Sequence, residues 1–221
     1  MTRREACLVV AAALAALAGA AVWLAAEGRA WPVFLVERLL LQGKEVPPEA
    51  LHAAWERAPD PEEALLPGRS LHYRSLLAVP LTADPDRPLA ERVELLAAAL
   101  PDAESALARD PADAHAWARL AYLRHGLHGP SPAVVAALRM SVYAAPAQPD
   151  LLNWRLELAA RSRDYWDPDF ADLVRSQLLR SWEANPRALA RTAAASGLAP
   201  LAREALARDP DALARFEALL P

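Results

Sequence analysis

Apolar residues recur at every third or fourth position along most of this chain, which is the spacing of helices that bury one face. The pattern is clearest between Asp110 and Pro149, where it forms two stripes. They consist of Trp117, Leu120 and Ala121, followed by Val134, Leu138, Ser141 and Ala145. Gly126, Gly129 and Pro130 lie between the stripes. The pattern therefore predicts a hairpin of two antiparallel helices.

The ends of this predicted hairpin carry residues typical of helix boundaries. Asp110 is suited to the N-cap and Pro111 to the first helical position, where its missing N–H costs no hydrogen bond. Pro146 ends the second helix. Small residues are expected to line the contact between the two helices and to allow a close approach. They are Ala118, Ala121, Ala133, Ala137 and Ser141.

Helical spacing continues on both sides of the hairpin. Stripes run over 89–100, 151–158 and 170–182, and Pro186, Pro200 and Pro210 mark three shorter helices. Residues 61–88 are the least regular, and there we expect short helices and loops. No stretch alternates apolar and polar residues long enough to indicate a strand, and the Asn-Gly or Asp-Gly hairpin signal is absent. We therefore predict an all-α protein.

The longest apolar run covers residues 6–26, contains no charged side chain and follows Arg3 and Arg4. Its length is sufficient for a helix that crosses a hydrocarbon core of roughly 30 Å. The two arginines favour a cytoplasmic N-terminus with the rest of the chain outside. We expect an uncleaved signal anchor, with a cleaved signal peptide and a buried helix as alternatives.

The residues after this run divide the chain further. Trp31, Phe34, Leu35 and Leu39 mark one helical face, which we expect to pack on the first helices of the domain. The alternative is a helix that lies on the membrane surface. We assign 1–30 to a cytoplasmic tip and transmembrane anchor, 31–87 to juxtamembrane helices and loops, and 88–221 to a helical domain.

Composition and motifs indicate a protein without catalytic chemistry. The 221 residues carry a formal net charge of −4 with both signs mixed, so no nucleic-acid partner is expected. Cys7 is the single cysteine. Neither a phosphate-binding glycine loop nor a nucleophile elbow is present. We predict that the protein is not an enzyme and has no cofactor.

Four groups of residues have side chains that could form a site. His125 and His128 are three positions apart but flank Gly126 in a glycine-rich stretch, so we expect no metal site. Trp166 is expected to be exposed at a break between helices, and His72, Tyr73 and Arg74 are expected to be ordinary surface or packing residues. Capping explains a group of carboxylates better than sugar chemistry does. These are Asp164, Asp167, Asp169 and Asp172.

The hairpin resembles a tetratricopeptide repeat, a pattern matched by Trp117, Leu120, Ala121, Ser141 and Pro146 if its loop carries one extra residue. The chain departs from that pattern at Arg124 and Leu138, where aromatic residues are usual. The resemblance implies stacked helical pairs that bind a partner through the groove of their first helices. Carried over by position, the groove residues are His115, Arg119, Tyr122, His125 and Arg155, beside Ala118.

Residues 85–221 are also similar to small bacterial proteins that are encoded with exopolysaccharide synthesis and export systems. The motifs are Ala-x-Ala-Trp-x-x-Leu-Ala in the hairpin and a tail that reads Arg-Asp-Pro-Asp-Ala-Leu-Ala-Arg-Phe-Glu-x-Leu-Leu. This resemblance implies a single-pass inner-membrane protein with a periplasmic domain, which serves as a scaffold for a protein partner in the cell envelope. The alternatives are a client-binding module of another assembly system, such as cytochrome c maturation, and an enzyme that acts on envelope glycans.

Overall fold

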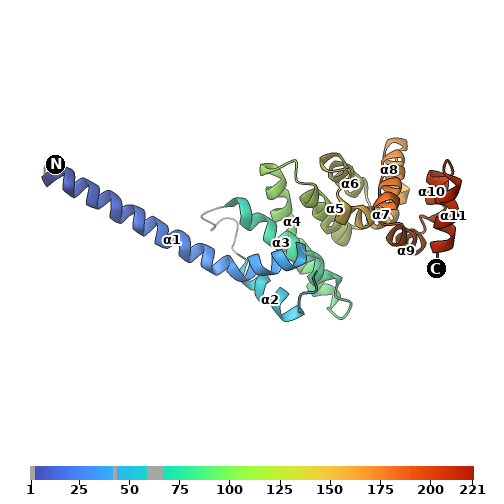
Figure 1. The fold of residues 1–221 in the computed structure, drawn as a ribbon. Helices are drawn as coiled ribbons and strands as arrows, with labels where there is room; N and C mark the ends of the chain where they lie inside the picture. The colour runs from blue at the N-terminus through green and yellow to red at the C-terminus, as the bar shows by residue number, and fades with distance from the viewer. Residues whose placement is uncertain (1–2, 42–43, 59–66) are drawn as a thin grey trace.

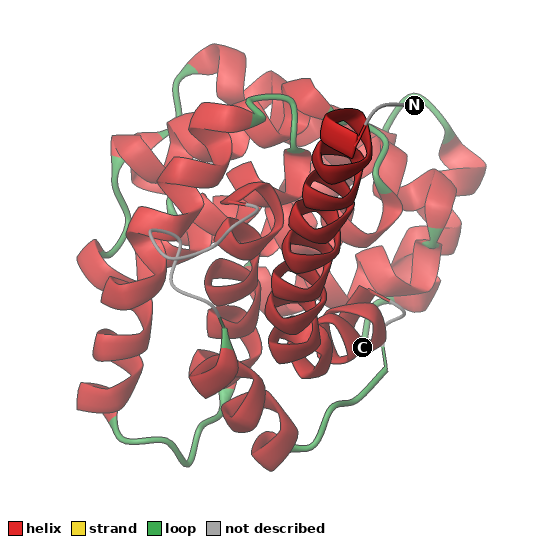
Figure 2. Ribbon diagram, turned by 90° about the vertical axis from the view of Figure 1, so that its left-hand side faces the viewer, coloured by secondary structure: helices red, strands yellow, loops and turns green. Residues whose placement is uncertain are grey.

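The computed structural model describes residues 3–41, 44–58 and 67–221. The side chains at 3–12, 23, 26, 27, 29, 30, 41 and 67–72 lie outside that description. The described backbone consists of helices and the turns that connect them, as Figure 2 shows by colour, and the all-α prediction is confirmed.

The helices follow one another in a chain of antiparallel pairs (Figure 1). Their bounds are α1 (Arg3–Leu41), α2 (Pro48–Arg57), α3 (Pro67–Ala83), α4 (Leu89–Arg109), α5 (Ala114–His128), α6 (Pro132–Ala144), α7 (Pro149–Arg161), the 3-10 helix η1 (Arg163–Tyr165), α8 (Pro168–Ala184), α9 (Pro186–Ser196), α10 (Ala199–Leu206) and α11 (Pro210–Leu219).

The pairs stack in sequence order. Each helix packs on the next, and each odd-numbered helix from α1 to α9 also contacts the following odd-numbered helix. On the other side of the stack, α6 contacts α8 and α8 contacts α10. In Figure 1, α6, α8 and α10 lie along the upper side and α9 lies below them. The molecule is therefore an elongated stack in which each pair supports its neighbours, as in helical-repeat proteins.

α1 is one continuous helix that serves two environments. Its N-terminal half projects away from the stack (Figure 1), and Leu14 and Leu17 there are 62% and 67% exposed. Its C-terminal half enters the core, where Val33 and Val36 are 0% and 5% exposed. The expected boundary near residue 30 is thus not a break in the helix. Packing of the second half holds the helix through Pro32, although proline removes a backbone donor.

The predicted anchor is only partly described. Within the described residues, no helix meets the length and hydropathy needed for a membrane span. Side chains of the apolar run are described at 13–22, 24 and 25, and the remainder of the run lies outside them.

The N-terminal helices share one hydrophobic cluster with the first long pair. It contains Val33, Val36, Leu51, Ala54, Ala58, Tyr73, Leu77, Leu81 and Leu95. All come from α1, α2, α3 and α4 except Ala58, which directly follows α2. The predicted boundary at 87/88 falls in the turn between α3 and α4, two helices that pack along each other. Residues 31–87 and the following helices are therefore joined by a common core.

The irregular segment 61–88 differs from its prediction. The expected short helices are replaced over 67–83 by one helix, α3, which continues through Pro80. Buried Leu77, Ala78 and Leu81 hold this part of α3 in the core, so packing compensates for the hydrogen bond that Pro80 cannot donate. Residues 59–66 lie outside the description.

The predicted hairpin is confirmed as α5 and α6, with one correction at its N-terminal end. Asp113, not Asp110, caps α5 and accepts from the backbone N–H groups of His115 and Ala116 at 2.8 and 3.0 Å. Asp110 instead ends α4 and accepts from Ala112 N at 3.1 Å in the turn.

The loop glycines of the hairpin also have different roles. Gly126 lies inside α5, where a Cβ atom would be 2.7 Å from Leu96 Cδ1. Gly129 ends the helix with a φ of 74°, a backbone angle that residues with a Cβ atom rarely adopt. The first glycine thus permits a close approach by α4, and the second makes the turn.

Candidate functional site

His115, at the start of α5, joins the next pair of helices. Its Nε2 atom lies 2.7 Å from Asp150 Oδ2 in the first turn of α7, and both side chains are partly exposed. Burial raises the pKa of Asp150, but hydrogen bonds from His115 and Gln148 outweigh it and leave that pKa lowered. The carboxylate is therefore held in its charged form beside the imidazole.

Arg119 lies one turn further along α5 and is largely covered. Its side chain is 12% exposed, and Nη2 lies 3.7 Å from Asp113 Oδ2. Burial lowers the pKa of Arg119, whereas the charges of Asp113 and of Glu37 on α1 oppose that shift. Arg119 therefore faces the α1 side of the stack and not open solvent.

Tyr122, on α5, contacts helices on both sides of its own. Its hydroxyl lies 2.9 Å from Thr82 Oγ1 and 3.5 Å from the carbonyl of Val79, both on α3. Its ring is 5.9 Å from that of Trp154 on α7, centroid to centroid. The side chain thus links α3, α5 and α7.

His125 is half-buried in the last turn of α5. Its Nε2 atom is buried without a hydrogen-bond partner among the described residues. Burial lowers the pKa of His125, and the charge of Arg161 at the end of α7 lowers it further. The imidazole is therefore favoured in its neutral form.

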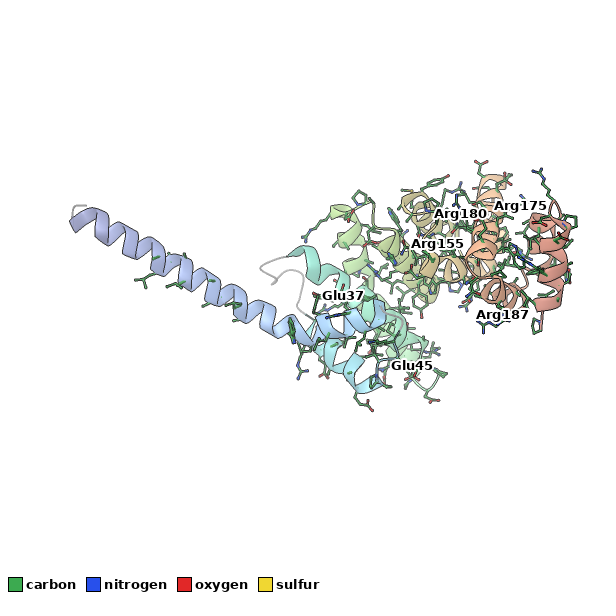
Figure 3. The ribbon with its side chains drawn as sticks, viewed as in Figure 1. Glu37, Glu45, Arg155, Arg175, Arg180 and Arg187 are labelled. Atoms are coloured by element: carbon green, nitrogen blue, oxygen red, sulfur yellow. The ribbon has the colours of Figure 1, made fainter. Side chains whose placement is uncertain are left out.

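Arg155 is 2% exposed, so it does not line an open groove as the sequence predicted. Its Nε and Nη2 atoms donate to the Oγ and carbonyl oxygen of Ser141, and Nη1 donates to Ala145 O and to Gln177 Oε1. Burial lowers its pKa to about 10, with Asp150 opposing the shift. Figure 3 places Arg155 inside the stack, where it joins α6, α7 and α8.

Of the five residues predicted by position, His115, Tyr122 and Arg155 make contacts between successive helical pairs. Because Arg155 is buried, the five residues do not line one open groove. Sequence spacing correctly placed four of the five on α5. It could not show that Tyr122, His115 and Arg155 would form hydrogen bonds with Thr82, Asp150 and Ser141, respectively. Those partners lie 40, 35 and 14 positions away in the chain.

Three of the other sequence candidates, Asp167, Asp172 and Trp166, also have structural partners. Asp167 caps α8 and lies 2.6 Å from Arg139 Nη2, while Asp172 is paired with Arg175. Trp166 is half-buried and donates to Ala159 O at 3.0 Å, so it is less exposed than expected. The described part of the chain contains no group of three histidine, cysteine, aspartate or glutamate side chains arranged to hold a metal ion.

Open surface is found at both ends of α9. A hollow of about 480 Å³ lies at its N-terminal end, and another of about 380 Å³ lies at its C-terminal end. The first is lined by Asn185, Pro186, Arg187, Arg215, Ala218 and Leu219. The second is lined by Glu157, Ala160, Arg161, Ala195 and Ser196.

A third hollow, of about 370 Å³, lies where the end of α1 meets α2 and the α3–α4 turn. Lys44 and Arg87 line it together with Glu45 and Asp84, so its charges are balanced. Figure 3 shows Glu45 at this lower side of the molecule.

The surface residues of α9 were missed by the sequence analysis. Arg187 and Arg191 are four positions apart and exposed, and α9 contains no acidic residue. That local signal was visible in the sequence, but the nearly balanced charge of the whole chain concealed it.

Comparison with known proteins assigns the chain to no family. No protein-family model, no curated protein and no solved structure matches the chain.

Proposed function

We propose that the protein is a membrane-anchored, non-catalytic helical adaptor that binds a protein partner in the bacterial cell envelope. The observation that carries the proposal is the dual environment of α1. Leu14, Leu17, Val22 and Leu24 are exposed at 56–67% in its projecting half. Such a concentration of exposed apolar side chains requires a lipid or protein environment.

The membrane part of the proposal is supported by the sequence of the projecting half. Residues 6–26 contain no charge and follow two arginines, which favours a single pass with the stack on the outer side of the inner membrane. A membrane anchor would confine the search for a partner to one plane and raise the effective concentration.

The adaptor part is supported by the elongated stack of helical pairs. Such stacks present long surfaces and commonly bind other proteins. The tetratricopeptide-like spacing of the α5–α6 hairpin agrees with this architecture, and the similarity to exopolysaccharide-associated proteins suggests synthesis or export components as partners.

The first test is membrane extraction. We expect the full-length protein to remain in the membrane fraction at alkaline pH. A Leu14→Arg/Leu17→Arg variant should be released, because two charges in the apolar run oppose insertion. Exposed Leu89→Arg on α4 provides a matched control, and it should remain membrane-bound. Equal release of the wild type and both variants would contradict the anchor.

The second test is affinity capture after mild crosslinking in native membranes. We expect envelope proteins of polysaccharide synthesis or export to be enriched with the wild type and lost with the Leu14→Arg/Leu17→Arg variant. Enrichment of unfolded secreted proteins in their place would favour the client-binding alternative and contradict the scaffold.

A further inference from the structure

We propose that the exposed face of α9 binds an extended acidic segment of the partner protein. The carboxylates of that segment would meet Arg187, Arg191 and Arg215, and an aliphatic side chain would enter the adjoining hollow. This inference rests on the proposed adaptor function and specifies the chemistry of the partner.

The outward residues of α9 form one continuous face. Arg187, Arg191, Ala194 and Ala195 are exposed, and their spacing of four, three and one positions places them on the same side of the helix. Leu189, Ala190 and Ala193 on the opposite side are fully buried. The face leads from the hollow at Arg187 to the hollow at Ala195.

Three arginines on this surface have no acidic partner. Among the described residues, Arg187, Arg191 and Arg215 form no ion pair. Glu217, two positions from Arg215, is already engaged by Arg203 on α10 through contacts of 2.6 and 3.1 Å. The surface therefore keeps positive charge available for an anion.

Packing positions one of these arginines beside the first hollow. The guanidinium carbon of Arg215 lies 5.2 Å from the ring centroid of Trp182, which is only 7% exposed. This cation–π contact holds the cation above the ring and leaves its N–H groups free to donate.

The lining of that hollow distinguishes a peptide from a sulfated or uronic polysaccharide. Pro186, Ala218 and Leu219 supply apolar surface, and no carboxylate lines the hollow. A leucine or valine side chain would cover this surface, whereas a charged sugar would leave it without an apolar partner. Arg215 covers Trp182, so that ring is not presented for stacking on a sugar.

The dimensions agree with a short extended segment. Ala195 lies eight positions after Arg187, which is about 12 Å along a helix at 1.5 Å per residue. An extended chain covers that distance with about four residues at roughly 3.3 Å each. The second hollow, which contains both Glu157 and Arg161, would then receive a polar residue.

The test is a direct binding measurement on the full-length protein in a neutral detergent. The probe is a fluorescein-labelled decapeptide of alternating glutamate and leucine, followed by fluorescence anisotropy. We expect saturable binding that weakens as salt is added, because exposed charges are screened. Arg187→Glu/Arg191→Glu should raise the Kd about tenfold or more.

The matched control is Arg109→Glu/Arg180→Glu, which makes the same charge change at two exposed arginines away from α9. Figure 3 shows Arg180 on the upper side of the stack and Arg187 on the lower side. The control should keep the Kd within about twofold of the wild type. Ala218→Asp, which adds a carboxylate to the hollow and removes no arginine, should also weaken binding.

Three results of this binding measurement would overturn the inference. They are no binding of the probe, equal losses in the α9 variant and the control, and undiminished binding when serine replaces leucine in the peptide. The last result, together with competition by sulfated dextran, would indicate a general polyanion surface. The proposed adaptor function has a separate outcome: if Arg187→Glu/Arg191→Glu still captures the envelope partner, the adaptor stands and the α9 site does not.

Discussion

Arg155 on α7 donates two hydrogen bonds to Ser141 on α6. Its Nε atom is 3.0 Å from the Ser141 hydroxyl oxygen, and Nη2 is 2.7 Å from the Ser141 carbonyl oxygen. Ser141 Oγ in turn donates to the carbonyl of Ala114 on α5 at 2.7 Å. The pair therefore ties three successive helices together through polar contacts in the middle of an apolar core.

Replacing Arg155 by alanine should destabilise the stack. The change removes hydrogen bonds to Ser141 O, Ala145 O and Gln177 Oε1 and leaves a cavity, so we expect a loss of about 3 kcal/mol. Urea unfolding, followed by circular dichroism, measures it. Arg180→Ala, at an exposed position on α8, should change the free energy of unfolding by less than about 0.5 kcal/mol. Equal midpoints for the two variants would show that the Arg155 contacts contribute nothing net.

The two aspartates before α5 should differ in their contribution to stability. Asp113→Ala removes the N-cap that accepts from two backbone N–H groups, and should cost about 1 kcal/mol. Asp110→Ala removes one exposed turn contact and should cost less. Thermal melts of both variants under the same conditions make the comparison. A larger loss for Asp110 would restore the cap position that the sequence suggested.

His125 should make stability depend on pH below its ordinary pKa of 6.5. Because burial and Arg161 lower the pKa of this imidazole in the folded state, the unfolded chain takes up a proton first as the pH falls. The contribution of His125 to the free energy of unfolding is therefore fully present above pH 6.5. It is lost as the pH falls from there toward and through the folded-state pKa.

The comparison that isolates this effect is the melting temperature of the wild type and His125→Leu between pH 5 and 7.5. We expect the variant to show a weaker decrease on acidification, with the remaining histidines common to both proteins. Parallel curves would assign the pH dependence to other groups.

Gly126 and Leu96 should show coupled effects on stability. A Cβ atom at Gly126 would be 2.7 Å from Leu96 Cδ1, so Gly126→Ala should cost about 1 kcal/mol through overpacking. In a Leu96→Ala background the same change should stabilise by about 1 kcal/mol, because alanine favours a helix over glycine. A double-mutant cycle from urea unfolding measures the coupling. Additive effects would mean that Leu96 moves aside without cost.

The fold was predictable where the local pattern and the packing agree. The stripes of α5 and α6 placed Leu120, Ala121, Val134 and Leu138 in the core, where each is at most 2% exposed. The continuity of α1 was not predictable, because Gly28 and Pro32 locally disfavour a helix. Burial of Val33 and Val36 in the cluster shared with α2 and α3 offsets that preference, and the local pattern around Gly28 and Pro32 does not show this contact.

The candidate site was less predictable for a related reason. Position within a repeat indicates which side of a helix a residue occupies, but not what covers that side. Tyr122 received Thr82 and Trp154 as neighbours from other helices, and Arg155 received Ser141 and Gln177. The arginines of α9 stayed open because its neighbour α11 brings Arg215, and not a carboxylate, to the adjoining hollow.

The continuity of α1 has a mechanical consequence. Its 39 residues amount to a rod of about 58 Å, more than half of which lies beyond the stack (Figure 1). A hinge between the two halves would let the stack swivel, whereas an unbroken helix transmits torque. Any tilt or rotation of the projecting half is therefore transmitted to the stack. The fold itself sets the direction in which the α9 face points relative to the axis of α1.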